Sequence, residues 1–337
     1  MRRRSLLLGL PLALGAAGLP AMARAQGTDP AAVSGKLTLY TSQLEADAAQ
    51  TVEAFRKRYP NVQVDWLRGG TNDIMPRLRA EIASGTPRAD VLLLADALTM
   101  ESLAAENRLR PSPEVQIGNV PAAQIDGQRR YFATKLITTG IAYNTRAPFA
   151  PKRWADLVDA RTRNLVTMPS PAVSGAAALH LSATAQDGAL GWDYLNKLVE
   201  NGVQARGGNG QVMQAISTGE RPYGIVVDYL AIRAAAKGAP VRFVFPEDGV
   251  SAVTEPAAIL SSTQNAPAAI AFVSFLLSRD GQELASRQGF LPADPKVAPP
   301  EGFPDPASIK VMPLDAARAL RENDATLRRF NDLLEQR

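Results

Sequence analysis

The chain has 337 residues, with 37 Lys and Arg, 33 Asp and Glu, one His and no Cys. This length suggests two domains or one large one, with ample core. The absence of Cys excludes disulfides, Cys-ligated zinc, iron–sulfur clusters and thiol catalysis, and one His excludes a multi-His metal site. Four arginines before residue 26 account for the net charge of +4, so the rest is neutral and gives no argument for nucleic-acid binding.

The first 25 residues have the pattern of a cleavable signal peptide. Arg2–Arg4 form a basic segment, Leu6–Leu19 is apolar, and Ala23-Arg24-Ala25 matches a cleavage site, so the mature chain would start at Gln26. The pattern predicts export to the periplasm by the Sec or the twin-arginine route. The alternative is an uncleaved anchor or a lipoprotein, and a lipoprotein would need a Cys at the cleavage point. No later apolar run approaches eighteen residues, so we do not expect a membrane-embedded protein.

The mature chain alternates between short apolar strands and amphipathic helices. Strands are predicted at Lys36–Tyr40, Val62–Leu67, Val91–Leu94, Leu165–Thr167, Tyr223–Val227 and Val241–Phe245. Helical spacing connects Ala48, Val52, Phe55 and Tyr59, and again Ile74, Leu78 and Ile82 before Gly85. This order predicts an α/β fold whose parallel sheets carry helices on both faces, with ligands beyond the carboxyl ends of the strands.

Two longer extended segments differ from these strands. Tyr131–Thr145 contains no helical pattern, and Val253–Leu260 follows more than a hundred residues later. Because they bracket a self-contained α/β block, they indicate a hinge, with one domain inserted into the other. The alternative is that both are ordinary central strands.

Four loops with small or hydroxylated residues lie directly before predicted helices. They are Thr41-Ser42-Gln43, Gly69-Gly70-Thr71-Asn72, Val173-Ser174-Gly175-Ala176 and Gly207-Gly208-Asn209-Gly210-Gln211. The N-terminus of a helix offers unpaired N–H groups and the positive end of the helix dipole, which favours an anion. Ser, Thr and Asn also serve as plain N-caps, so each loop alone is weak evidence of a site. Together the loops predict an anion site built from both halves of the chain.

Acidic side chains also stand at the carboxyl ends of strands. Asp96 and Asp228 each follow an apolar strand, either as ligand contacts or as caps of the next helix. His180 lies in an apolar stretch and is expected to be a packed helix residue rather than a catalytic one. We find no nucleophile elbow, P-loop, zinc-protease motif or dinucleotide fingerprint.

The chain resembles a solute-binding protein of an ABC importer, in the ferric-iron or phosphonate-type branch of the extracellular solute-binding proteins. The resemblance covers about Leu37 to Leu334. It rests on LYTSQLEADAAQTVEAFRKRYP, ADVLLLAD, TTGIAYNT, PSPAVSGAA, GNGQVMQAISTGERPYGIVVDY, TEPAAIL and AFVSFLLSRDGQELASRQGFLP.

The resemblance implies a two-lobed, type II periplasmic-binding-protein fold, a Venus flytrap with two hinge-crossing strands. It implies lobes at 36–137 with 256–300 and at 138–255 with 301–337, after a signal peptide at 1–25. It also implies C-terminal helices folded onto the second lobe. The implied partners are a small anionic ligand and an inner-membrane ABC permease, and we expect a monomer with no cofactor and no enzymatic activity.

The iron ligands of this branch are not retained in the sequence. Ferric-binding members similar to this chain use a His in the first loop, a Glu in the second and an adjacent Tyr pair, whereas here the pair reads Asp228-Tyr229 and the loops lack the His and Glu. Ferric ion requires several anionic oxygens. The positions for the synergistic anion do resemble the family, as Ser174-Gly175-Ala176 and Asn209.

We therefore expect the anion itself, an organic phosphate, sugar phosphate or aminophosphonate, to be the ligand, with Asp228 or Glu255 reading its other end. One alternative is a ferric receptor that uses Tyr229 and an added anion, and another is an exported phosphoester hydrolase on the same fold. The expected ligand-binding residues are Thr41, Ser42, Gln43, Gly70, Thr71, Asn72, Asp96, Thr139, Ser174, Gly175, Ala176, Asn209, Gln211, Asp228, Tyr229 and Glu255.

Overall fold

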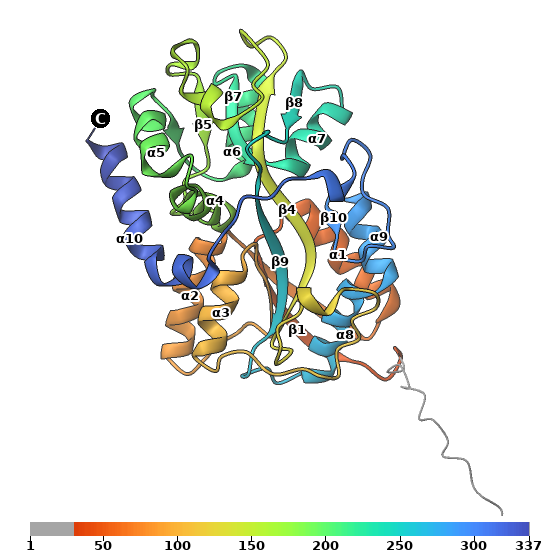
Figure 1. The fold of residues 1–337 in the computed structure, drawn as a ribbon. Helices are drawn as coiled ribbons and strands as arrows, with labels where there is room; N and C mark the ends of the chain where they lie inside the picture. The colour runs from red at the N-terminus through yellow and green to blue at the C-terminus, as the bar shows by residue number, and fades with distance from the viewer. Residues whose placement is uncertain (1–29, 337) are drawn as a thin grey trace, which may run out of the picture.

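The computed structural model describes residues 30–336, so the predicted signal peptide lies outside the described residues. Two lobes lie one above the other, and two long strands, β4 (Tyr131–Asn144) and β9 (Ser251–Ile259), run from one into the other (Figure 1). These strands pair antiparallel with each other. They are the two long extended segments of the sequence, and their path confirms the hinge-crossing arrangement.

One mixed sheet runs through both lobes of the described chain, in the order β2-β1-β3-β9-β4-β7-β5-β6, with β8 and β10 also paired to β4. The remaining strands are β1 (Gly35–Thr41), β2 (Val62–Arg68), β3 (Val91–Leu93), β5 (Val166–Met168), β6 (Gln204–Ala205), β7 (Tyr223–Val227), β8 (Val241–Val244) and β10 (Leu291–Pro292). Pairing within each lobe is parallel for β1 with β2 and β3, and for β5 with β6 and β7. In each lobe the carboxyl ends of the parallel strands therefore lie at the same edge of the sheet, which is the edge where the β-α order predicts a ligand site.

The first lobe contains β1 to β3 with helices on both faces. One face is covered by α1 (Glu45–Arg58), α8 (Ala266–Leu277) and α9 (Arg279–Arg287), the other by α2 (Thr71–Ala83) and α3 (Ala97–Ala105). Strand β1 shows why both faces are apolar. Leu37 and Leu39 join the core under α1 and α8, whereas Tyr40 joins the core under α2 and α3.

The second lobe contains β5 to β8 and is built the same way. Helices α4 (Gly175–Gln186), α5 (Gly191–Glu200) and α10 (Ala316–Glu335) pack together, and α6 (Asn209–Thr218) and α7 (Asp228–Ala236) cover the other side. Phe330 of α10 is fully buried in this core, so the C-terminal helix folds onto the second lobe as the resemblance implied. His180 is also buried, beside the Trp154 ring, with its Nδ1 3.0 Å from Ser251 Oγ.

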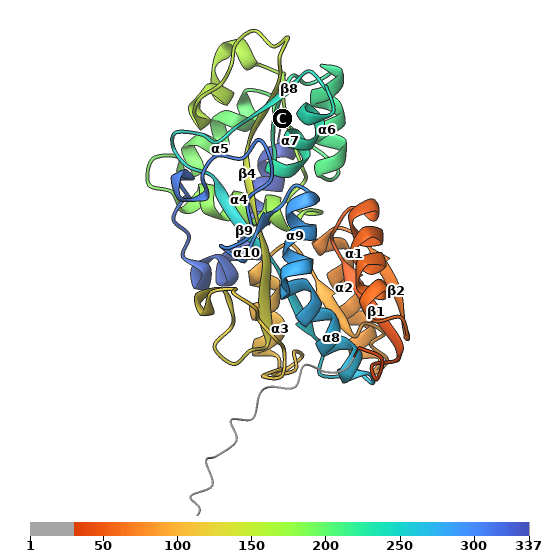
Figure 2. The ribbon, with the colours of Figure 1, turned by 90° about the vertical axis from the view of Figure 1, so that its right-hand side faces the viewer.

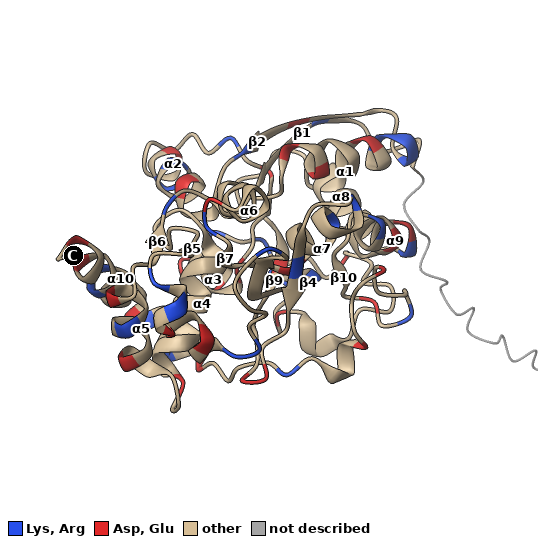
Figure 3. Ribbon diagram, turned by 90° about the horizontal axis from the view of Figure 1, so that it is seen from above, with Lys and Arg blue, Asp and Glu red and all other residues tan. Residues whose placement is uncertain are grey.

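The connections include short 3₁₀ turns at Ala122–Gln124, Trp154–Val158, Ala160–Thr162 and Pro306–Ser308. Between residues 30 and 336 no helix is long and apolar enough to cross a bilayer. Acidic and basic residues are interspersed over both lobes (Figure 3).

The division between the lobes falls within the crossing strands. The expected boundaries, at 137/138 and 255/256, lie inside β4 and β9, and Figure 2 shows the lobes separating on either side of these strands. Helices α8 and α9 pack with the first lobe, and α10 packs on α4 and α5. The residue boundaries themselves stay a prediction.

Candidate functional site

A cavity of about 620 Å³ lies between the two lobes. It receives residues from the first lobe, from the second lobe and from both crossing strands. Of the residues expected to bind ligand, it is lined by Ser42, Gly70, Thr71, Ser174, Gly175, Ala176, Asn209, Gln211, Tyr229 and Glu255. The structure therefore brings together the four loops that are far apart in the sequence.

Helices α1, α2, α4 and α6 all begin at this cavity. The first residues of these helices, Glu45, Thr71, Gly175 and Asn209, are part of the lining. The first N–H groups of a helix have no intrahelical acceptor, and the helix dipole is positive at this end. Four such ends directed at one cavity create a local excess of hydrogen-bond donors, which suits an oxyanion.

The start of α4 shows how these donors remain available. Ser174 Oγ caps the helix by accepting the Ala177 N–H at 3.3 Å, and it also accepts Asn209 Nδ2–H at 3.2 Å. The N–H groups of Gly175 and Ala176 have no acceptor among the described residues. Asn209 is held in turn because its Oδ1 accepts the Val227 N–H at 3.3 Å. Ser174 and Asn209 thus form a fixed polar wall on the second lobe.

Some of the expected residues lie behind the lining. Thr41 is buried and accepts the Gln43 N–H at 3.1 Å, and Thr139 is buried in β4. Asn72 donates to the Pro171 carbonyl of the opposite lobe at 2.8 Å. Asp96 caps α3, with its carboxylate accepting the Thr99 N–H at 2.6 Å and the Thr99 hydroxyl at 2.9 Å. These groups support the walls of the cavity rather than line it.

Asp228 is turned away from the cavity toward the crossing strand β4. Its Oδ2 accepts the Thr138 N–H at 2.8 Å and the Thr138 hydroxyl at 2.7 Å, and its Oδ1 accepts the Tyr229 N–H at 2.6 Å. Burial raises the pKa of Asp228 to about 7, although these three donors oppose the rise. Asp228 therefore fixes the start of α7 against β4, and Glu255 is the acidic residue of the pair that reaches the cavity.

Replacing Asp228 by Asn should flatten the pH dependence of the unfolding free energy between pH 4 and pH 7. The folded-state pKa is raised above the unfolded value, so the native protein binds more protons in this window and loses stability as the pH rises through it. The variant lacks this part of the slope. Urea unfolding at pH 4.5, 5.5, 6.5 and 7.5 measures it, and parallel curves for the two proteins would contradict the assignment.

Several residues of the lining are absent from the expected ligand-binding residues. They are Leu44, Glu45, Arg68, Asp73, Ala95, Ile137, Val173, Gly207, Gly208, Gly210, Gln214 and Val227. Val173, Gly207, Gly208 and Gly210 belong to the loops predicted to form the anion site, and the others were not predicted. Arg68 is the basic side chain of the described lining, and its Nε donates to the Gln43 carbonyl at 3.0 Å. Its place at the carboxyl end of a strand was a usable signal, because that edge of the sheet carries the site.

Two tyrosines of the second lobe bear on the ferric alternative, and they lie in different places. Tyr229 lines the cavity, and burial raises the pKa of its phenol, which opposes the phenolate form that ferric ion binds. Tyr223 lies in the second-lobe core, where its hydroxyl donates to the Phe149 carbonyl at 3.0 Å. No cluster of three or more His, Cys, Asp or Glu residues with metal-ligand placement occurs in the part of the chain that the structure describes.

Comparison with known proteins decides the family. Residues 86–320, more than half of the chain, match the model of the bacterial extracellular solute-binding proteins. The chain belongs to this family. A Sinorhizobium fredii relative, named a probable ABC transporter periplasmic-binding protein, is 24% identical over 262 residues, which cover 74% of this chain and 71% of the relative.

Solved structures with this fold are periplasmic binding proteins. AfuA from Actinobacillus pleuropneumoniae, described with exogenous fructose-6-phosphate bound, has a TM-score of 0.77 at 22% identity and covers 89% of this chain and 99% of its own. Iron-bound HitA from Pseudomonas aeruginosa has a TM-score of 0.75 at 23% identity, with 88% and 99% covered. These likenesses confirm the two-lobed type II fold of this solute-binding protein. It is a receptor of the ABC-transporter type, a class of periplasmic proteins that work with a small ligand and a membrane permease.

The lobes of this solute-binding protein touch on two sides of the cavity. On one side Asn72 bonds to Pro171, and Gly70 lies against the Val173 carbonyl. On the other side Arg233 of α7 forms a bidentate ion pair with Asp47 of α1, with N–O distances of 3.0 Å. The structure therefore describes a closed arrangement in which both lobes can contact one ligand.

Proposed function

We propose that this solute-binding protein captures a small organic oxyanion of the phosphate ester or phosphonate type and delivers it to an inner-membrane ABC permease. The observation that carries the proposal is the convergence of α1, α2, α4 and α6 on one cavity, with N–H groups at Gly175 and Ala176 that have no acceptor within residues 30–336. Fructose-6-phosphate in AfuA, a protein with the same fold, supports a ligand of this class.

Ligand capture follows from the two-lobed geometry. An oxyanion at the start of α4 and α6 would also lie near Thr71 and Arg68 of the first lobe, so that it gains contacts from both lobes only when they are closed. Differential binding to the closed form shifts the population toward it. The permease then distinguishes the loaded receptor by its shape.

We also propose that the protein is not an enzyme and acts as a monomer in the periplasm after removal of residues 1–25. Ser174, whose hydroxyl caps α4, contacts an amide and a backbone N–H, and neither can serve as a general base. The chain has one His, and it is buried beside Trp154 and Ser251. The ferric alternative, which would use Tyr229, is supported by the fold of HitA but opposed by the raised phenol pKa.

Isothermal titration with inorganic phosphate, fructose 6-phosphate, 2-aminoethylphosphonate and ferric citrate tests the proposal. We expect binding of at least one organic phosphorus compound, none of iron, and no turnover of the ligand after prolonged incubation. Binding of ferric citrate alone would refute the proposal and make Tyr229 the residue to replace.

Replacing Ser174 by Ala should weaken binding of that compound about tenfold, because the oxyanion loses one charge-assisted hydrogen bond. Asn209→Ala should act similarly, since Asn209 holds the Ser174 hydroxyl in place. Ser217→Ala is the matched control, because Ser217 lies in the same lobe outside the cavity lining. Equal affinities for Ser174→Ala and Ser217→Ala would place the oxyanion elsewhere.

A further inference from the structure

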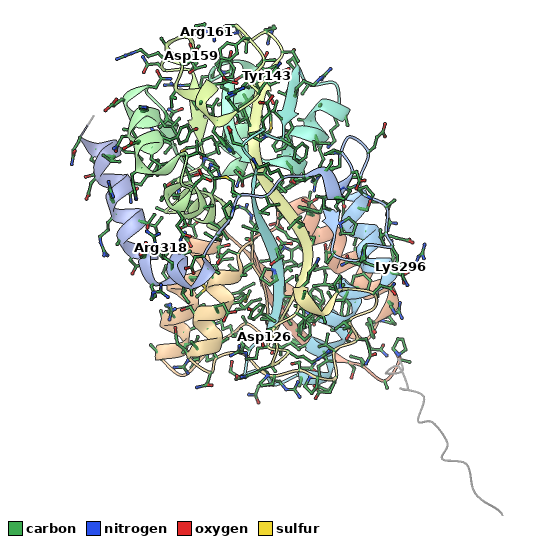
Figure 4. All side chains as sticks on the ribbon, viewed as in Figure 1. Asp126, Tyr143, Asp159, Arg161, Lys296 and Arg318 are labelled. Carbon is green, nitrogen blue, oxygen red and sulfur yellow. The ribbon has the colours of Figure 1, made fainter. Side chains whose placement is uncertain are left out.

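An ion pair between the two crossing strands lies at the floor of the cavity, with Glu255 in the lining and Lys135 behind it. Lys135 of β4 and Glu255 of β9 lie 2.7 Å apart, with side chains 4% and 2% exposed, and Glu255 lines the cavity. Many other ion pairs are exposed, such as Asp159 with Arg161 at the far end of the second lobe (Figure 4). Lys and Glu are almost never fully buried unless they are paired.

Local backbone geometry places Lys135 there. The pairing of β4 with β9 shifts register between Ala133 and Leu136, which is a bulge at the crossing point. Bulges redirect side chains and are frequent beside sites. Lys135 Nζ also lies 4.2 Å from the centre of the Phe290 ring, so its charge faces Glu255 on one side and an aromatic surface on the other. The floor as a unit therefore carries no net charge.

A polar atom of the lining lacks a partner among the described residues. Thr71 is 1% exposed and part of the lining, and its Oγ1 has no hydrogen bond. Gln43, 2% exposed, lies behind the lining next to the Glu255 carboxylate, and Glu255 Oε2 is held by Lys135. Buried polar groups without partners are costly and rare in native proteins. Donors and acceptors of a ligand would satisfy them.

We propose that this floor, formed by Thr71 and Glu255 with Gln43 and Lys135 behind them, binds the hydroxyl groups of a polyol or sugar phosphate. The proposal rests on the proposed function, with the phosphate at the start of α4 and α6. A hydroxyl both donates and accepts, so it matches the Glu255 carboxylate and the Thr71 hydroxyl without adding charge. An ammonium group would add positive charge beside Lys135. The cavity volume, about 620 Å³, is that of an organic-ligand site rather than of a single-ion site.

Titration with four probes separates the ligand classes: inorganic phosphate, ethyl phosphate, 2-aminoethylphosphonate and fructose 6-phosphate. We expect fructose 6-phosphate to bind at least tenfold more tightly than ethyl phosphate, and 2-aminoethylphosphonate no more tightly than ethyl phosphate. Tightest binding of 2-aminoethylphosphonate would overturn this inference and leave the proposed function standing, whereas tightest binding of inorganic phosphate would overturn both. Binding of none of the four would refute both.

Two variants locate the hydroxyl contacts. Thr71→Val removes an unpartnered buried hydroxyl, so we expect the melting temperature to stay or rise while affinity for fructose 6-phosphate falls about tenfold. Glu255→Gln should weaken fructose 6-phosphate about tenfold relative to ethyl phosphate, with Glu220→Gln, an exposed carboxylate outside the cavity lining, as the control. If Thr71→Val binds fructose 6-phosphate as the original protein does, the floor does not bind hydroxyls.

Discussion

Replacing Gly175 by Ala is expected to weaken ligand binding at least tenfold while both lobes stay folded. A Cβ at this position of the second lobe would lie 2.6 Å from Asp96 Oδ2 and 3.1 Å from Thr71 Oγ1, and both of these belong to the first lobe. Asp96 cannot swing aside easily, because both its carboxylate oxygens are held by Thr99. An alanine therefore keeps the lobes apart on this side of the cavity.

We expect Gly175→Ala to hinder closure of the lobes without lowering the stability of either lobe. Ala is a better helix residue than Gly, by up to about 1 kcal/mol, so an isolated second lobe should be as stable as before or more stable. Gly70 has the same relation to the opposite lobe, since a Cβ there would overlap the Val173 carbonyl oxygen. Its φ of −63° is open to any residue, so the close approach of the lobes, and not backbone conformation, requires Gly at this position.

Small-angle scattering with and without ligand measures closure, and titration measures affinity. We expect the Gly175→Ala protein to contract less than the original protein when ligand is added. Gly188→Ala is the matched control, because Gly188 lies in the same lobe outside the cavity lining and has no atom within 4 Å of its Cβ direction. If Gly175→Ala binds and contracts normally, the closed arrangement in the structure is not the one that holds the ligand.

The strand and helix periodicities were sufficient to predict much of the fold. The sequence predicts hinge segments at Tyr131–Thr145 and Val253–Leu260, because both are extended and they bracket an α/β block. In the structure these segments are β4 and β9. The structure begins β9 two residues earlier, at Ser251. The pattern gives no sign of the bulge that brings Lys135 to Glu255, since a bulge depends on which strands pair.

The loops at the cavity could be predicted because the N-terminus of a helix has a local signature in the sequence. The direction of Asp228 could not, because it depends on Thr138, ninety positions earlier. Asp228 and Glu255 therefore looked equivalent, and only the crossing of β4 and β9 distinguishes the positioning residue from the one that lines the cavity. Gln43 was predicted as a ligand contact, and the structure places it behind the lining, next to the Glu255 carboxylate, so that this stays a prediction.

The ion pair between Arg233 and Asp47 is expected to stabilise the closed form on the side of the cavity opposite the glycine contacts. Arg233 Nη1 lies 3.0 Å from both carboxylate oxygens of Asp47, and its guanidinium packs 4.6 Å from the Tyr229 ring and 4.9 Å from the Phe290 ring. Asp47 is 3% exposed in this arrangement. If the lobes separate, water can reach the carboxylate again, so the cost of losing Arg233 applies to the closed form alone.

Arg233→Met is therefore expected to reduce ligand affinity about thirtyfold with little change in the unfolding of either lobe. Removal of one partner from a buried ion pair costs about 3–5 kcal/mol, and the partial exposure of Arg233 lowers this to about 2 kcal/mol. Asp47→Asn with Arg233→Met should recover part of the affinity, because no unpaired carboxylate is then buried. Titration of the single and double variants with ligand measures the coupling free energy between Arg233 and Asp47. If the losses of affinity are purely additive, Arg233 and Asp47 stay apart when ligand binds. The lobes would then meet only on the side of Gly70 and Gly175.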